Sequence, residues 1–356
     1  MKRKIFIVFG TRPEAIKMAP VYHAFKNDKT FDVKLILSGQ HEKMLYQAID
    51  VFSMDYHYDL KIMVHGQTLT HITTKVLSGL EKIFKIEKPD LLIVHGDTTT
   101  TFASALSGFY HRIPVAHVEA GLRTFDLCQP YPEEANRTLT DKISTLLFAP
   151  TKKAKENLIN EGIDRKKIFI TGNTIVDALM MAKEKAIRSK YGIKKVENFL
   201  KNGKKMILLT FHRRENWGKP MEGVFKVLKK IHDEFKNIFF FYPVHLNPVI
   251  KELARKYLFG LKRFVITEPL DYLKFLKAII DSHFIITDSG GIQEEAPSFS
   301  KIVFVLRNKT ERPEAVEKGF CKIIGTEPEK VYNNIKNIIK NESIIRKMKK
   351  KKNPFG

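Results

Sequence analysis

Charged side chains follow several short apolar runs in the first half of the sequence, where parallel strands would end. Arg12 follows the first run, with Lys17 just beyond one helical turn, while Asp97 and Glu119 follow two later runs. A carboxylate can take up and return a proton, and a cation near a helix N-terminus can hold an anion. These residues predict acid and base groups close to an anionic ligand.

The second half of the sequence carries groups suited to phosphate. Residues 210–216, Thr-Phe-His-Arg-Arg-Glu-Asn, follow one apolar run, and Ser289, Gly290 and Gly291 follow another at the start of a predicted helix. Glycine lets the backbone approach a phosphate closely, and the N-terminus of a helix favours negative charge. A Ser-Gly-Gly turn is weakly specific alone, so it is the clustering of these groups at strand ends that predicts a phosphate site.

Structural roles compete with functional ones for the candidate carboxylates. Asp97 and Glu119 could each cap a helix, and Glu133 follows Pro132 as a helix-start glutamate would. Capping does not require two carboxylates, an arginine and a lysine to converge. The clustering of Asp97 and Glu119 therefore favours a functional site, whereas spacing alone favours a helix start for Glu133.

One short motif occurs in both halves. Arg-Pro-Glu-Ala stands at residues 12–15 and again at residues 312–315, each time after a predicted strand. Proline suits the first position of a helix, glutamate suits the first turn, and an arginine ahead of exposed N–H groups makes an anion site. Arg12 and Arg312 are therefore candidate anion-binding residues, although two well-formed helix starts would give the same pattern.

The elements that must position these residues are short strands that alternate with amphipathic helices, which is typical of βαβ units and a parallel sheet. In the first half we expect strands at residues 4–9, 33–37, 91–94, 115–118 and 146–149. In the second half we expect them at residues 205–210, 238–242, 264–267, 284–287 and 302–306. The sequence thus predicts an α/β protein with two Rossmann-like doubly wound parallel-sheet domains and a cleft between them.

The length of 356 residues supports two domains, because single cores rarely grow beyond about 250 residues. We expect the boundary at Gly172-Asn173-Thr174. Residues 1–171 would then carry the acid and base carboxylates, residues 172–344 the phosphate-binding groups, and residues 345–356 a basic tail.

The composition of the chain limits the classes of partner that we expect it to bind. The formal net charge of +23 raises the question of nucleic acid, but basic residues are spread along the chain and the one dense cluster lies at residues 346–352. Neither an aromatic-interleaved basic stripe nor a finger motif accompanies that cluster. No nucleic-acid partner is expected, and the positive charge would instead help to attract anionic nucleotides.

Several motifs are absent. No apolar run approaches the ~18 residues that span a membrane, and the two cysteines, Cys128 and Cys321, lie far apart without ligand spacing. This suits a reducing cytoplasm and predicts neither membrane insertion nor a metal site. The Gly-x-Gly-x-x-Gly, P-loop and His-Glu-x-x-His motifs are also missing, so no nicotinamide or flavin cofactor is expected.

Longer motifs make the sequence recognisable. In the first half they are GTRPEAIKMAP at 10–20, HGD at 95–97, HVEAGLR at 117–123 and PEEANR at 132–137. In the second half they are GNT at 172–174, FHRREN at 211–216, DSGGIQEEAP at 288–297 and ERPEAV at 311–316. Together they resemble the non-hydrolysing UDP-N-acetylglucosamine 2-epimerases, from residue 4 to about residue 326.

This resemblance implies a fold of the glycosyltransferase B type, a final helix that returns to the first domain, and a homodimer. It implies reversible conversion of UDP-N-acetylglucosamine to UDP-N-acetylmannosamine without an added cofactor. The route in this family is anti elimination of UDP to 2-acetamidoglucal, followed by readdition of UDP. Residues 172–344 would then be the UDP-binding domain.

The resemblance also implies roles for individual residues. The acid and base groups would be three carboxylates, with a histidine acting on the leaving phosphate: Asp97, Glu119, Glu133 and His212. Glu295 would bind the ribose and Phe275 would lie beside uracil, while the phosphates would contact Arg12, Lys17, Ser289, Gly290, Gly291 and Arg312. Some bacterial members bind a second substrate molecule as an activator, in a pocket that Gln40, His41, Gln67 and His245 resemble in part, but Gly66 stands where such members tend to carry an arginine.

Three alternatives stay open at this point. A hydrolysing epimerase shares the fold and the elimination step but releases free N-acetylmannosamine. A retaining glycosyltransferase also shares the fold, and a basic nucleic-acid-binding protein is the alternative from another class. The stretch EAGLR at residues 119–123 favours the non-hydrolysing branch.

Overall fold

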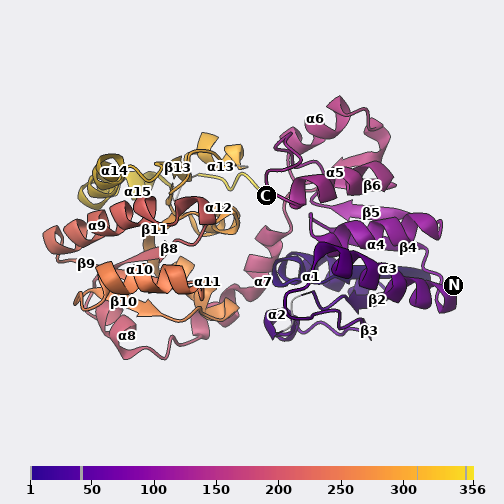
Figure 1. Ribbon diagram of the computed structural model, residues 1–356, viewed down its shortest axis with the longest axis horizontal. Helices are drawn as coiled ribbons and strands as arrows, with labels where there is room; N and C mark the ends of the chain where they lie inside the picture. Colours follow the sequence, from indigo (N-terminus) through magenta and orange to yellow (C-terminus); the bar gives the residue numbers. More distant parts are fainter. Residues whose placement is uncertain (1, 41–42, 311, 349–350) are drawn as a thin grey trace. The chain divides into compact units, whose positions relative to one another are not determined.

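The computed structural model describes residues 2–40, 43–310, 312–348 and 351–356. The chain divides into two compact units, which are described separately here (Figure 1). The first unit is Met1–Met181 with Phe355–Gly356, and the second unit is Ala182–Pro354.

The first unit contains a parallel sheet in the order β3-β2-β1-β4-β5-β6-β7. Its sequence order reverses between β1 and β4, which is the topological switch point of a Rossmann-like sheet. The strands are β1 (Arg3–Phe9), β2 (Phe31–Leu37), β3 (Tyr58–Asp59), β4 (Leu91–His95), β5 (Val115–Val118), β6 (Leu146–Ala149) and β7 (Ile168–Ile170).

Helices cover the sheet of the first unit because each βα connection returns the chain across a face. On one face α3 and α4 bury Val76, Leu80 and Ala103 against Phe6 and Val94 of the strands. The helices are α1 (Arg12–Asn27), α2 (Lys43–Phe52), α3 (Leu69–Ile86), α4 (Thr99–Tyr110), α5 (Glu133–Ile143), α6 (Lys152–Asn160) and α7 (Ile175–Arg188), with a 3-10 turn η1 (Arg165–Lys167).

The second unit repeats this topology, with a parallel sheet in the order β10-β9-β8-β11-β12-β13 and a switch point between β8 and β11. The strands are β8 (Lys205–Thr210), β9 (Ile238–Pro243), β10 (Phe264–Thr267), β11 (Ser282–Thr287), β12 (Val303–Val305) and β13 (Cys321–Ile323). The helices are α8 (Lys194–Lys201), α9 (Lys219–Glu234), α10 (Pro248–Leu258), α11 (Tyr272–Asp281), α12 (Gly290–Glu295), α13 (Pro313–Glu317), α14 (Pro328–Lys340) and α15 (Glu342–Met348), with 3-10 turns η2 (Arg214–Asn216) and η3 (Ala296–Phe299).

Aromatic side chains dominate the core of the second unit. All six residues of β9 are buried, as is expected of a central strand with helices on both faces. Phe240 on β9 stacks on Phe264 of β10 with ring centroids 4.4 Å apart. α9, α10 and α14 supply the aliphatic side of this core.

The ten expected strands are all present, which confirms the α/β fold class with two parallel sheets. Three strands were missed, namely β3, β7 and β13, and each lies at the edge of its sheet with two or three residues. Strands this short cannot carry the longer apolar run that marks a central strand.

The two units meet in sequence within α7, which begins shortly after the Gly172-Asn173-Thr174 turn. The chain ends in the first unit, where the backbone N–H of Asn173 donates to the carbonyl oxygen of Phe355 at 2.9 Å and the Phe355 side chain is buried. Across the described residues, every helix is too short or too polar to cross a lipid bilayer.

Candidate active site

The predicted site residues follow strands at the two switch points. In the first unit, Arg12 follows β1 and Asp97 follows β4; in the second, His212 follows β8 and Ser289 follows β11. Ligands of open α/β sheets bind beyond the carboxyl ends of strands at such points. Each unit therefore places its candidate groups where a ligand site is expected.

Glu119 lies directly after β5 and its carboxylate meets a buried cation. Oε2 lies 2.5 Å from Nζ of Lys17, which is 9% exposed, and 3.8 Å from Nε2 of His95. Burial opposes ionisation, but the Lys17 ammonium and the His95 imidazole outweigh it and hold the pKa of Glu119 well below its ordinary value. Its backbone lies in the left-handed region, with a φ of 69°. A carboxylate held charged on such a backbone is typical of a functional site.

The carboxylate of Glu14 folds back over the start of its own helix, α1. The backbone N–H groups of Gly10 and Thr11 donate to Oε2 of Glu14 at 3.1 and 2.8 Å. The hydroxyl of Thr98 donates to Oε1 at 2.8 Å, and the hydroxyl oxygen of Thr101 lies 3.0 Å from the same atom. The sequence suggested exposed N–H groups here, but Glu14 turns back and caps its own helix. Arg12 and Lys17 therefore lie on a helix where Glu14 already occupies the N–H groups of the two residues that precede it.

Asp97 precedes α4 without capping it, because Thr98 is the residue whose hydroxyl accepts from the N–H of Thr101. The Asp97 carboxylate instead contacts Nη2 of Arg137, and its carbonyl oxygen accepts from Nδ2 of Asn136 at 3.0 Å. Arg137 and Asn136 both come from α5. The structure thus rules out the capping role for Asp97 and shows that its carboxylate contacts the buried Arg137.

Arg137 was not among the candidate residues. Its Nη1 lies 2.9 Å from Oε2 of Glu134, whose other oxygen accepts from the N–H groups of Thr124 and Phe125. The spacing of three residues between Glu134 and Arg137 was a signal for one helix face. Glu133, the neighbouring candidate, is half-buried at the first position of α5, where a helix-start glutamate also belongs.

A buried network joins the loops that carry Asp97 and Glu119. Nδ1 of His117 lies 2.6 Å from Oδ1 of Asp141, and its Nε2 lies 2.7 Å from the carbonyl oxygen of Gly96. Oδ2 of Asp141 accepts from the N–H of Gly121 and pairs with Arg123 at 2.7 Å. Burial opposes ionisation of Asp141, but His117 and Arg123 lower its pKa. The ends of β4 and β5 are thereby held together.

In the second unit the buried carboxylate of Asp288 holds the loop that follows β8. It accepts from the backbone N–H groups of His212 and Arg213 and from Nδ2 of Asn216, at 2.8 to 3.1 Å. The His212 ring stacks on His245 with centroids 5.5 Å apart. Burial, His245 and Arg213 lower the pKa of His212, against the opposing charge of Asp288. These surroundings favour the neutral imidazole of His212.

Two guanidinium groups lie beside the glycine that opens α12. A Cβ at Gly290 would lie 3.7 Å from Cζ of Arg312 and 3.8 Å from Nη2 of Arg213. Glu294 orients Arg312, because its Oε1 lies 2.7 Å from both Nε and Nη2. Ser289 precedes the helix and Gly291 is exposed. The structure thus gathers the predicted Arg312, Ser289 and glycines, and adds Arg213, which sequence reasoning left out.

Comparison with known proteins decides the family. The family profile described as UDP-N-acetylglucosamine 2-epimerase matches residues 23–356. The chain belongs to this family of epimerases. A curated relative in Salmonella typhimurium, named UDP-N-acetylglucosamine 2-epimerase, is 46% identical over 99% of this chain and 95% of its own length.

Solved structures of this family match the whole chain. UDP-GlcNAc 2-epimerase from Neisseria meningitidis bound to UDP-GlcNAc has a TM-score of 0.91 and 42% identity, covering 99% of this chain and 96% of that one. The S. aureus MnaA-UDP co-structure has a TM-score of 0.89 and 45% identity, covering 99% and 92%. These matches confirm the family inferred from the motifs and the fold class of the glycosyltransferase B type.

Six further candidates of the epimerase pattern lie on both units. Phe275 is half-buried on α11, and Glu295 is half-buried at the end of α12. Of the proposed activator pocket, Nε2 of Gln67 donates to the carbonyl oxygen of Gln40 at 3.0 Å, while His245 belongs to the second unit. His41 lies outside the described residues. Gly66 faces open space, with no atom within 4 Å of a built Cβ.

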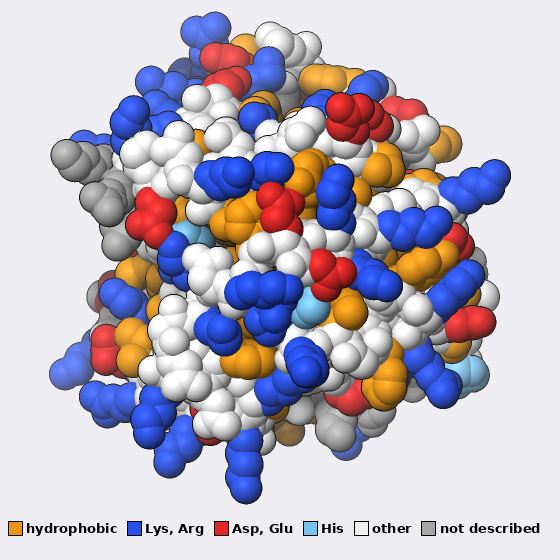
Figure 2. Space-filling view, turned by 90° about the vertical axis from the view of Figure 1, so that its left-hand side faces the viewer, with side chains coloured by type: hydrophobic (Ala, Val, Ile, Leu, Met, Phe, Trp, Pro, Cys, Tyr) orange, Lys and Arg blue, Asp and Glu red, His pale blue; other side chains and the backbone are white. Residues whose placement is uncertain are grey.

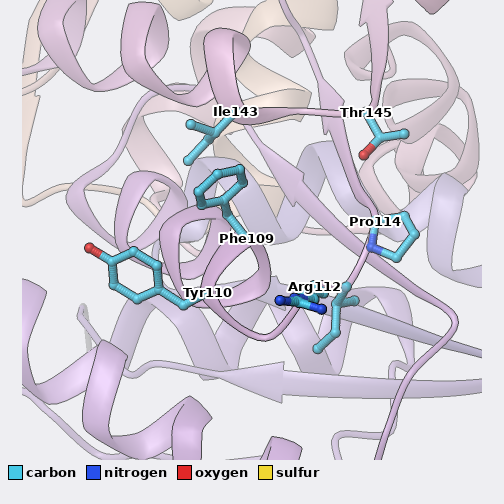
Figure 3. A pocket seen from close by; sticks show the side chains of 7 residues that line it. Phe109, Tyr110, Arg112, Pro114, Ile143 and Thr145 are labelled. Carbon is cyan, nitrogen blue, oxygen red and sulfur yellow. The ribbon is translucent and has the colours of Figure 1, made fainter.

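A hollow of about 500 Å³ in the first unit is a separate feature (Figure 3). It lies at the amino edge of the sheet, opposite the carboxyl ends that carry the candidate site, and is lined by Phe109, Tyr110, Arg112, Ile113, Pro114, Ile143 and Thr145. Within the described ranges, His, Cys, Asp and Glu side chains form no group of three or more that could ligate a metal ion.

Proposed function

We propose that this chain reversibly converts UDP-N-acetylglucosamine to UDP-N-acetylmannosamine by inverting carbon 2. Relatives named for this substrate, one of them solved with UDP-GlcNAc bound, support the choice of substrate. The observation that carries the proposal is the pair of carboxylates at the ends of β4 and β5, because Asp97 and Glu119 each contact a buried cation. A carboxylate can accept a proton, so either residue can serve as the base at carbon 2.

The proposed route is anti elimination followed by readdition. A hydrogen beside an acetamido group is not acidic, so the bond from carbon 1 to UDP breaks as a carboxylate removes the carbon 2 proton. The electron pair of the C–H bond forms the double bond of 2-acetamidoglucal, and UDP leaves with the pair of the C–O bond. A proton then returns to carbon 2 on the other face, and an oxygen of the UDP β-phosphate forms a new bond to carbon 1. Asp97, Glu119 and Glu133 carry these proton transfers.

In this proposal the second unit provides most of the contacts that bind UDP. Arg312, Arg213 and the Ser289-Gly290-Gly291 turn would hold the diphosphate, with His212 acting on the leaving phosphate, Glu295 on the ribose and Phe275 beside uracil. Hydrogen bonds to charged groups contribute about 1.5 to 3 kcal/mol each, so three or four of them can retain cleaved UDP until it returns. Arg12 and Lys17 would add positive charge from the first unit.

Incubation with UDP-N-acetylglucosamine in heavy water tests the proposal. The expected product is a mixture of UDP-bound epimers with deuterium at carbon 2, seen by proton NMR. Free N-acetylmannosamine with UDP would identify a hydrolysing epimerase instead. Epimer without deuterium would exclude proton removal at carbon 2, and an absence of turnover unless an acceptor sugar is added would favour a glycosyltransferase.

A nucleic-acid-binding role has less support. On the face shown in Figure 2, lysine and arginine side chains are scattered among acidic and apolar ones rather than gathered in one field. Retention on DNA that falls with salt, without binding of UDP-sugars, would reverse this view.

The assembly and compartment are part of the same proposal. We propose a homodimer that uses the first unit, where Phe109 and Tyr110 beside the hollow of Figure 3 are 56% and 66% exposed. A monomer mass in light scattering at micromolar concentration would refute it. The free thiols of Cys128 and Cys321 suit a cytoplasmic enzyme.

Dependence on an activator is open to a direct assay. Because Gly66 offers no side chain, we propose that a second substrate molecule is not required. Purified UDP-N-acetylmannosamine alone should then be converted from the first seconds, and the rate should rise hyperbolically with its concentration. A lag that trace UDP-N-acetylglucosamine abolishes would show that activation persists.

A further inference from the structure

His95 is a buried imidazole without a hydrogen bond. It ends β4 and is 3% exposed, and neither Nδ1 nor Nε2 has a hydrogen-bond partner among the described residues. A histidine ring carries at least one N–H donor, and buried donors in native proteins are nearly always paired. The exception calls for an explanation in the surroundings of the ring.

One of the candidate acid and base groups, Glu119, lies close to the His95 ring. Nε2 of His95 lies 3.8 Å from Oε2 of Glu119, which also takes the Lys17 ammonium at 2.5 Å. The 3.8 Å separation of these two atoms exceeds the length of a hydrogen bond. A small movement of either side chain would bring them within hydrogen-bonding distance. In the described part of the chain, Oε1 of Glu119 receives no hydrogen bond. The two oxygens of this carboxylate therefore have different surroundings, because the contacts with Lys17 and His95 are both made by Oε2.

The backbone brings these two residues together. His95 pairs with Val118 across β4 and β5, and Glu119 is the next residue. The Thr101 hydroxyl donates to the carbonyl oxygen of His95 at 2.6 Å, and the N–H of Glu119 donates to the carbonyl oxygen of Phe148 at 3.1 Å. The left-handed backbone of Glu119 costs energy and persists only where its surroundings hold it. Both residues are thus anchored at the same sheet edge.

We propose that His95 is a positioning residue whose Nε2–H donates to Oε2 of Glu119 and so presents Oε1 to the carbon 2 hydrogen of the substrate. Lys17 and His95 would then hold one oxygen from two sides, and the other oxygen would be the one that takes the proton. The contact between His95 and Glu119 follows from the geometry alone. Its consequence for turnover rests on the proposed epimerase function.

Three variants test this inference. His95→Phe keeps a ring and removes both nitrogens, while His95→Gln keeps a donor near the position of Nε2. We expect kcat of His95→Phe to fall about 10- to 100-fold, as for a misplaced catalytic group, with KM for UDP-N-acetylglucosamine changed less than about threefold. His95→Gln should recover most of the loss. The control, His111→Phe, removes a histidine from the far end of α4 and should behave as the unaltered protein.

The pH profile separates positioning from mere structural support. A hydrogen bond to a carboxylate lowers its pKa, so losing the donor should move the acid limb of kcat/KM to higher pH by about one unit in His95→Phe. Carbon-13 NMR of labelled glutamate should show the same rise for Glu119 without any substrate. An unchanged Glu119 titration in His95→Phe would overturn the proposal, as would His95→Gln with the full kinetic defect and an unmoved acid limb.

The outcomes distinguish this inference from the proposed function. If the unaltered protein makes no epimer in heavy water, the proposed function fails, but the NMR titration still decides whether His95 holds Glu119. If His95→Phe does not fold, the comparison of His95→Gln with His95→Ala by the same titration takes its place. A shifted Glu119 titration in the variant that lacks a donor supports the inference, and equal titrations refute it.

Discussion

The guanidinium of Arg137 contacts the carboxylate of Asp97 with Nη2 and lies 2.9 Å from that of Glu134 with Nη1. This fork fixes the direction of Asp97 from α5. Lysine would keep the charge but not the two-pronged geometry. We expect Arg137→Lys to lower kcat about 10- to 100-fold while UDP affinity changes little. Steady-state kinetics and calorimetric UDP titration would check this.

Arg165→Lys provides the control for that prediction, because Arg165 is exposed on η1. It should leave kcat unchanged. If Arg137→Lys turned over substrate at the normal rate, the orientation of Asp97 by Arg137 would have no catalytic value. A large fall in thermal stability together with lost UDP binding would instead indicate a purely structural ion pair.

Asp97→Asn and Glu119→Gln should each lose turnover by about 10²- to 10⁴-fold, because an amide cannot act as an acid or base at carbon 2. UDP should still bind, since the proposed diphosphate ligands are other residues. Exchange of deuterium into substrate should fall in parallel with kcat. Loss of UDP binding in both variants would argue that these carboxylates support the fold rather than the reaction.

The guanidinium groups beside Gly290 lead to a prediction about affinity. Arg213→Gln and Arg312→Gln should each weaken UDP binding about 10- to 100-fold, the value of a charged hydrogen bond. Arg214→Gln is the matched control, because Arg214 is adjacent in sequence but exposed. Equal UDP affinity in Arg213→Gln and Arg214→Gln would remove Arg213 from the proposed site.

His212 should respond to UDP in a direction that its pKa sets. Burial and neighbouring cations hold this pKa below 6.5 in the free protein. A bound anion favours the imidazolium, so UDP should raise the pKa of His212, and UDP should bind more tightly as pH falls from 7.5 to 6. NMR titration of the ring with and without UDP measures this. His283, whose pKa burial lowers to about 4 at the other end of β11, should not respond.

Glu87 gives a prediction about stability. Its carboxylate pairs with Lys4 at 2.9 Å and also contacts Lys34 and Tyr58, which outweigh burial and lower its pKa to about 2. Because the folded pKa lies below the ordinary 4.5, the stabilisation is complete above pH 4.5 and is lost as pH falls toward 2. After solvent screening, Glu87→Gln should lower the free energy of unfolding at pH 7 by roughly 1 kcal/mol.

Denaturant titrations at several pH values would measure that effect. The difference between Glu87→Gln and the unaltered protein should shrink from pH 4.5 to pH 2. Glu81→Gln removes an exposed helix pair in which Lys85 lowers the pKa of Glu81, and because solvent screens this pair the dependence on pH should be smaller. A difference that stayed constant with pH would assign the loss to packing rather than to charge.

The sequence predicted which edge of each sheet carries the site but not which side chains meet there. Strand ends could be located because central strands are continuous apolar runs, as in β9. The contact between Arg137 and Asp97 joins residues 40 positions apart, and its existence depends on how α5 packs beside α4. Periodicity does not report such packing. The edge strand β3 was missed for a related reason, because two half-buried residues carry too little pattern.

The inward turn of Glu14 was also beyond the reach of local rules. A glutamate in the first turn stabilises a helix start whichever way its side chain points. The sequence therefore does not show where the side chain of Glu14 lies. The burial of Glu14 becomes apparent only from its tertiary contacts with Thr98, which caps α4, and with Thr101 in that helix. The same motif in the second unit places Arg312 at the N-cap of α13 instead, where Glu294 holds it.

The carboxylate of Glu14 acts as a permanently tethered competitor at the start of α1. A group attached to the chain has an effective concentration far above that of dissolved ions, commonly in the millimolar range or higher. Inorganic phosphate, abundant in any cell, would have to displace it to reach the N–H groups of Gly10 and Thr11. At these two N–H groups the first unit therefore favours its own carboxylate over a dissolved anion.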